Sequence, residues 1–128
     1  MSIDPATPPA AEAAMADLAA ELDDARTALA EKRDAEVAAK HARDKARREK
    51  RFSKDCPKAA GPDRTCTVRD REAWIDDQTA DEDLAYELAK AARQAAAEHL
   101  KTLGQQLSAA QSISRSVGND FPGTRSTW

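Results

Sequence analysis

The fold is decided by residues 10–55, AAEAAMADLAAELDDARTALAEKRDAEVAAKHARDKARREKRFSKD, which contain neither glycine nor proline. Alanine is the most frequent residue of this stretch and is also the strongest helix former. A helix over all of it would be on the order of 70 Å long, because each residue adds about 1.5 Å along the axis. A rod of this length cannot fold on itself, so its apolar residues need a second helix to cover them.

Proline and glycine limit this helix on both sides. Residues 1–9 include Pro8 and Pro9, and we expect a flexible, extended arm that ends where one of these prolines occupies the first turn of the helix. Residues 56–67, CPKAAGPDRTCT, contain further prolines and a glycine. They predict a loop after the first helix.

A second long helix is expected over residues 68–117. It opens with Thr67 and Asp70, whose spacing is that of a capping box, in which each side chain accepts a hydrogen bond from the backbone of the other. Glycine and proline recur within residues 118–128. We therefore expect the chain to end in a flexible tail.

Large apolar residues recur at spacings of three and four in both helices, as a buried helix face requires. In the second helix this stripe begins at Leu84 and Leu88, and Gly104 lies further along it, which suggests close approach of another backbone or a bend. Folding the chain about the loop brings the leucine-bearing ends together, so the predicted fold class is all-α, an antiparallel coiled-coil-like hairpin. The alternative is a pair of helices that dimerise with another copy of the chain. The expected helix-pairing core comprises Leu18, Leu22, Leu29, Leu100, Leu103 and Leu107.

The composition predicts a thin core. Hydrophobic residues make up 41% of the 128-residue chain, but many of them are alanine, which buries little area. Charged residues make up 34% and leave a net charge of only −3, whereas disordered chains of low hydrophobicity usually carry a large net charge. We therefore expect one helical domain that is stabilised by another protein or by self-association, as a homo-oligomer.

The location of the protein is predicted from two further features. No apolar run approaches the roughly 18 residues that would span a bilayer, so no membrane contact is expected. The N-terminal sequence MSIDPATPPAA lacks the basic and then apolar segments of a secretory signal. We expect a cytoplasmic protein.

Cys56 and Cys66 stand near the two ends of the predicted loop. They are candidates for a disulfide that would contribute about 3 kcal/mol through loop-closure entropy, whereas cytoplasmic conditions favour two reduced thiols. A structural zinc ion needs about four ligands, and the hairpin places His41 and His99 far from both cysteines. No metal site within one chain is expected, and a metal bridge between the loops of two copies lacks a Cys-x-x-Cys pair.

Residues 40–54 form a segment rich in lysine and arginine, which we call the basic arm. Such a segment can rest on nucleic-acid phosphates, although Phe52 is its only aromatic residue. The other interpretation is a solvated helix face, neutralised by (i, i+4) pairs such as Glu36 with Lys40 and by acids of the second helix. The candidate nucleic-acid contacts are Lys40, Arg43, Arg47, Arg48, Lys50, Arg51 and Lys54, and the neutralising acids are Asp70, Glu72, Asp76 and Asp77.

Catalytic motifs are absent from the sequence. It contains no glycine-rich phosphate loop, no helical His-Glu-x-x-His and no serine or cysteine nucleophile flanked by a plausible histidine. The run Asp81-Glu82-Asp83 lies on a predicted helix surface, where nothing indicates the burial that perturbs a catalytic carboxylate. We expect no enzymatic activity, no cofactor and no small-molecule substrate.

Part of the chain resembles a known group of proteins. The residues concerned are Arg71-Glu72-Ala73-Trp74, the alanine-rich helix after them, and Leu103-Gly104-Gln105-Gln106-Leu107-Ser108-Ala109-Ala110-Gln111-Ser112. Over about a third of the chain, they look like small alanine-rich helical-hairpin proteins encoded by phages of high-GC bacteria, some of them near recombination or replication genes. The resemblance implies an accessory protein and brings no catalytic motif with it.

Together these observations predict a non-catalytic helical module for protein interaction or assembly, a phage or bacterial accessory protein. The alternative is a nucleic-acid-associated accessory factor of recombination or replication that uses the basic arm. Two aromatic residues of the tail, Phe121 and Trp128, either fold back over the leucines or act as a peptide-like anchor for a partner.

Overall fold

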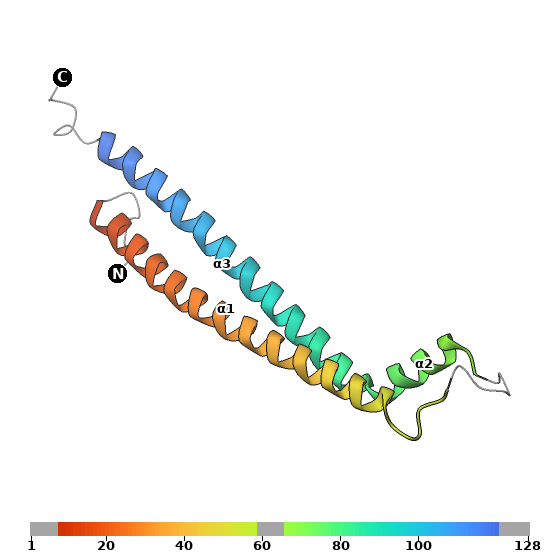
Figure 1. The fold of residues 1–128 in the computed structure, drawn as a ribbon. Coiled ribbons are helices and arrows are strands. Elements are labelled where there is room, and N and C mark those ends of the chain that lie inside the picture. The colour runs from red at the N-terminus through yellow and green to blue at the C-terminus, as the bar shows by residue number, and fades with distance from the viewer. Residues whose placement is uncertain (1–7, 59–65, 121–128) are drawn as a thin grey trace. The chain divides into compact units, whose positions relative to one another are not determined.

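The computed structural model describes residues 8–58 and 66–120, over which the chain is all-helical (Figure 1). About 90% of these residues are helical and none of them lies in a strand, so the predicted all-α class is confirmed. The helices are α1 (Pro8–Arg51), α2 (Val68–Gln78) and α3 (Ala80–Asp120). α1 packs against α3, which is consistent with a hairpin.

Several predictions fall outside the described residues. These are the flexibility of most of the N-terminal arm, the conformation of the loop between residues 59 and 65, and the roles of Phe121 and Trp128 in the tail. Within the part that the structure describes, no helix is both long enough and apolar enough to cross a membrane.

α1 begins at Pro8, so proline occupies the first turn as expected, but the helix ends at Arg51 and not at residue 55. Ser53 accounts for this earlier end. Its hydroxyl accepts a hydrogen bond from the backbone N–H of Asp55 at 3.2 Å, and its carbonyl accepts one from the N–H of Cys56 at 3.2 Å. Local bonding of this kind competes with the helical pattern and turns the chain. Arg48, Lys50 and Arg51 lie in the last turn, where positive charge is favoured by the helix dipole.

α2 starts with the expected capping box. The hydroxyl of Thr67 accepts a hydrogen bond from the N–H of Asp70 at 3.1 Å, and the carboxylate of Asp70 accepts one from the N–H of Thr67 at 3.0 Å. These bonds satisfy backbone donors that the first helical turn leaves without partners.

The prediction of one uninterrupted helix over residues 68–117 is wrong at Thr79. This residue separates α2 from α3 with φ −110° and ψ 17°. Its hydroxyl donates to the carbonyl of Ile75 at 2.9 Å, a type of bond that bends helices. The backbone hydrogen bonds to Ile75 and from Asp83 persist at 3.0 and 2.9 Å, so the interruption is limited to one residue. Beyond it, α3 continues to Asp120, past Gly118 and Asn119.

The chain forms two compact units, and each is described by itself. In the first unit, the first part of α1 packs against α3 through a small apolar cluster. Leu22, Ala25 and Leu103 are buried together, and Leu29 and Ala11 are also buried in this unit. The half-buried residues that pack against the central three are Leu18, Leu100 and Leu107.

Gly104 follows the buried Leu103 in α3 but has no close neighbour. A methyl group placed on it would meet no other atom within 4 Å, apart from its own stretch of helix backbone. The close approach of another backbone that its place in the stripe suggests is therefore not present among the described residues.

The second unit, Glu31–Gln94, contains the end of α1, all of α2 and the start of α3 (Figure 1). Its fully buried side chains are those of Ile75 and Thr79. Leu84 and Leu88, the expected start of the core stripe, are instead 59% and 62% exposed. These two leucines therefore do not pair the helices of this unit.

Candidate interaction surfaces

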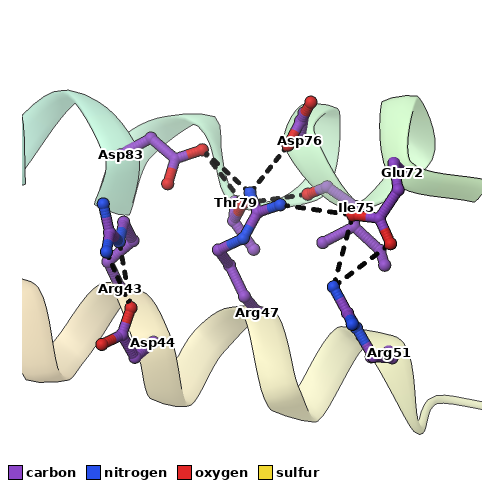
Figure 2. A network of polar contacts seen from close by, with 9 residues as sticks. All are labelled: Arg43, Asp44, Arg47, Arg51, Glu72, Ile75, Asp76, Thr79 and Asp83. Carbon is purple, nitrogen blue, oxygen red and sulfur yellow. Dashed lines mark hydrogen bonds and ion pairs between the residues drawn. The ribbon is translucent and has the colours of Figure 1, made fainter. Parts of the chain in front are cut away.

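The second unit is organised around the guanidinium group of Arg47, which α1 presents to α2 and α3 (Figure 2). One of its nitrogens, Nη1, lies 2.7 Å from Asp76 Oδ1 and 3.4 Å from Asp83 Oδ2, and it donates to the hydroxyl of Thr79 at 3.3 Å. Nη2 lies 3.6 Å from Glu72 Oε2. Only 25% of the Arg47 side chain is exposed, so one partly buried cation joins three carboxylates from two helices.

The pKa of Arg47 is raised, mainly by its hydrogen bond to Asp76 and further by the negative charges of Asp76, Asp83 and Glu72, against an opposing effect of burial. An arginine is charged at any physiological pH. The raised pKa therefore shows that the surrounding carboxylates favour the cation more than its partial burial disfavours it.

Two more arginines connect α2 to the end of α1 through polar contacts. Arg51 Nη2 lies 3.2 Å from Glu72 Oε1, so Glu72 lies between Arg47 and Arg51 (Figure 2). Arg71 of α2 donates to the carbonyl of Arg51 at 3.1 Å and to the sulfur of Cys56 at 3.4 Å. The carbonyl of Arg51 at the end of α1 thus receives a hydrogen bond that replaces its missing helical partner.

Further along the same unit, two more ion pairs involve α1. Glu36 accepts a hydrogen bond from Arg93 Nε at 2.6 Å, and this bond lowers the pKa of Glu36 while it raises that of Arg93. Arg43 donates to Asp44 Oδ1 at 2.9 and 3.1 Å, which lowers the pKa of Asp44. The guanidinium of Arg43 also lies 4.3 Å from the ring centre of Tyr86, a cation–π distance.

The basic arm is therefore divided by the fold. Arg43, Arg47 and Arg51 are in ion pairs within the chain. Pairing with Glu72 and Asp76 agrees with the expected neutralisation, whereas Asp70 serves the capping box. The candidates that form no ion pair with another described residue are Lys40, Arg48, Lys50 and Lys54.

Sequence reasoning missed Asp83, although a signal was present. Glu72, Asp76 and Asp83 are spaced by four and seven residues, which places them on one side of a helix, and Arg47 and Arg51 are spaced by four. Two matching stripes of opposite charge indicate an ionic contact between the helices.

The start of α3 presents a second stripe, which points to solvent. Consecutive helix residues are rotated by about 100°, so Thr79, Tyr86 and Arg93 lie within about 40° of one another, on the side that contacts α1. Leu84 and Leu88 are each about 160° from Tyr86. They are spaced by four residues, and the exposed Ala91 follows at a spacing of three, as in a coiled-coil seam.

The cysteines and depressions of this unit do not form a defined binding centre. Cys56, which is buried, and Cys66, which is half-buried, are free thiols in the structure, so the candidate disulfide is not formed. Within residues 8–58 and 66–120, no group of three histidine, cysteine or acidic side chains is placed to hold a metal ion. The depression beside Arg51, Phe52 and Cys56 is open to solvent.

Comparison of the chain with models of known protein families, with curated proteins and with solved structures finds no match.

Proposed function

We propose that this chain is a non-catalytic module for protein interaction or assembly, built as an antiparallel coiled-coil hairpin. The observation that carries the proposal is the exposure of Leu84 and Leu88 on α3, opposite the side that contacts α1. Two leucines one turn apart, followed by alanine in heptad spacing, form the apolar strip on which another helix packs.

The polar contacts of the second unit support this proposal because they make the leucines dispensable for pairing α1 with α3. Glu36 pairs with Arg93 and Arg47 pairs with Asp83, an order that is consistent with opposite helix directions. Ion pairs with shared partners fix this register. Burial of a leucine side chain stabilises an interface by about 1.5–3 kcal/mol. Because Leu84 and Leu88 are exposed in this chain, this free energy is available for binding a partner.

The nucleic-acid alternative has less support. Three of the seven candidate side chains of the basic arm are in ion pairs within the chain, and Phe52 is the only aromatic residue of the arm. The resemblance of residues 71–74 and 103–112 to phage proteins adds the proposal that the chain is an accessory protein of a phage or bacterium, acting in the cytoplasm.

A photo-crosslinking amino acid at Leu88 tests the proposed function in cells that produce the protein. We expect crosslinks to protein, either another copy or a different chain, because this side chain would lie within an interface. The same amino acid at Arg115, which is exposed on α3 in the first unit, is the control and should crosslink much less. The proposal is wrong if neither site yields a crosslinked protein while duplex or single-stranded DNA binds the purified chain in a salt-sensitive way.

A further inference from the structure

The side of α3 that points to solvent in the second unit combines apolar and acidic side chains. Leu84, Leu88 and Ala91 are exposed and lie within about 60° of one another around the helix. Asp81 and Glu87 are exposed as well, and they lie about 60° from Leu84, one on each side of it. Neither acid forms an ion pair with another residue of the described part of the chain. We call these five residues the acidic face.

The cations of the same stretch lie on the other side of the helix. Residues 80–94 contain two of them, Lys90 and Arg93. Both lie within about 40° of Tyr86, on the side that contacts α1, and Arg93 donates to Glu36 of α1 at 2.6 Å. The acidic face is therefore negatively charged on both borders of its apolar strip, although the whole chain has a net charge of only −3.

We propose, on the basis of the proposed function, that the partner on the acidic face is an amphipathic helix of a different protein, with large apolar side chains along one side and lysine or arginine on both borders. Its apolar side chains cover Leu84 and Leu88 and so remove their exposed surface from water. Its cations lie opposite Asp81 and Glu87. Opposite charges at the rim of an interface favour this class of partner over neutral or acidic helices.

Charge also disfavours a second copy of this chain as the partner. If two acidic faces pack on each other, an antiparallel arrangement centred on the strip brings the two Glu87 side chains close together, and a parallel one brings the two Asp81 side chains together. Like charges at an interface oppose binding. The outer side of α1 is not uniformly basic, because the exposed Asp34 lies within about 40° of Lys45 and Arg48 around the helix. A basic helix of a different protein avoids both conflicts.

Two synthetic helical peptides test the proposal with the full chain. Both carry leucines in heptad spacing, and the positions beside the leucines are lysine in one peptide and glutamate in the other. Titration followed by fluorescence anisotropy should give a dissociation constant at least about tenfold lower for the lysine peptide. Asp81→Lys with Glu87→Lys should reverse this preference, because the borders of the strip then attract glutamate. Leu84→Gln with Leu88→Gln should abolish binding of the lysine peptide, since the apolar contact is lost.

The control is Glu12→Lys with Asp17→Lys, which changes the net charge by the same amount as the charge-reversed variant, on exposed residues of the first unit. This protein should keep the preference of the wild type, and circular dichroism should show that all variants keep their helix content. Loss of the preference in the control would show that net charge attracts the peptide, and this overturns the proposal. Equal affinity of the wild type for the two peptides, or no binding of either at millimolar concentration, overturns it too. In each of these cases crosslinks from Leu88 to another protein chain would still support the proposed function, so the two proposals can fail separately.

Discussion

The two units pair the same two helices by different physical means. In the first unit, contact is made by leucines, and Leu22 and Leu103 are 6% and 4% exposed. In the second unit, contact is made by Arg47 and its three carboxylates, by Glu36 with Arg93, and by the bonds around Thr79. Apolar burial is favourable without directional requirements, whereas ionic contact depends on geometry and on solvent screening.

This difference has a consequence for the surface. Where leucines pair the helices, they are packed between the two helices. Where arginines and acids pair them, large apolar side chains such as Leu84, Leu88 and Val37 stay on the outside. Most of the exposed large apolar side chains among the described residues therefore lie in the ionic unit.

The largest expected effect comes from removing a leucine of the first unit. Leu103→Ala should lower the free energy of unfolding by about 2–5 kcal/mol, because it leaves a cavity in the small cluster with Leu22 and Ala25. Thermal or urea unfolding followed by circular dichroism measures this loss. Ile113→Ala is the matched control, since Ile113 lies on the same helix and is 55% exposed, and it should change stability by less than about 0.5 kcal/mol. Equal losses in the two variants would show that the first unit is not held by its leucine cluster.

A smaller loss is expected from the centre of the ionic unit. Arg47→Met should cost about 1–2 kcal/mol, because Asp76, Asp83 and Glu72 would lose their shared cation. The cost should shrink as salt is added, in contrast to that of Leu103→Ala, since exposed parts of the network are screened. Arg48→Met removes an equal charge from an exposed site and should be nearly neutral. A loss that salt does not alter would contradict an ionic origin.

A gain is expected at Gly104. Glycine in a helix interior is less favourable than alanine by about 1 kcal/mol, and a methyl group here would meet no other atom within 4 Å. Gly104→Ala should therefore raise the melting temperature. If it instead weakens self-association, another copy approaches α3 at this residue.

The leucine cluster could be predicted from sequence because spacing alone places Leu100, Leu103 and Leu107 on one side of α3. The stripe of Leu84 and Leu88, which points to solvent, cannot be distinguished from the buried one by spacings of three and four alone. The step from Leu88 to Leu100 is a rotation of about 120°, so leucines that appear to continue one stripe lie on different faces. A hydrophobic pattern predicts that a face is covered but does not say by which partner.

The ionic site was only partly predictable for a related reason. The charge balance between the basic arm and Glu72 or Asp76 follows from the hairpin, and both pairs are present. Thr79 interrupts the second helix without any glycine or proline to mark it, and its hydroxyl bonds both Ile75 and Asp83. The spacing of Asp83 from Glu72 and Asp76 indicates its part in the ionic contact, whereas its bond to Thr79 depends on this local geometry.

The smallest expected effect is a pH dependence of the stability that the ionic unit contributes. Because Arg93 lowers the pKa of Glu36 below its ordinary value of 4.5, the unfolded chain binds a proton at Glu36 more readily than the folded chain. The stabilisation from this pair is therefore fully present above the unfolded value and is lost as pH falls through the lower, folded value. Arg93→Met should be less stable than the wild type near neutral pH.

The difference in unfolding free energy between the wild type and Arg93→Met should narrow as the solution is acidified below about pH 4.5. Urea unfolding at a series of pH values measures it. The lowered pKa values of Asp44 and Asp70 arise from Arg43 and Thr67, which both proteins retain, so the comparison isolates Glu36 with Arg93. Lys101→Met, which removes an exposed cation from α3 in the first unit, is the control and should show no such convergence. A stability difference for Arg93→Met that stays constant down to low pH would mean that Arg93 stabilises the unit through packing of its side chain and not through the charge of Glu36.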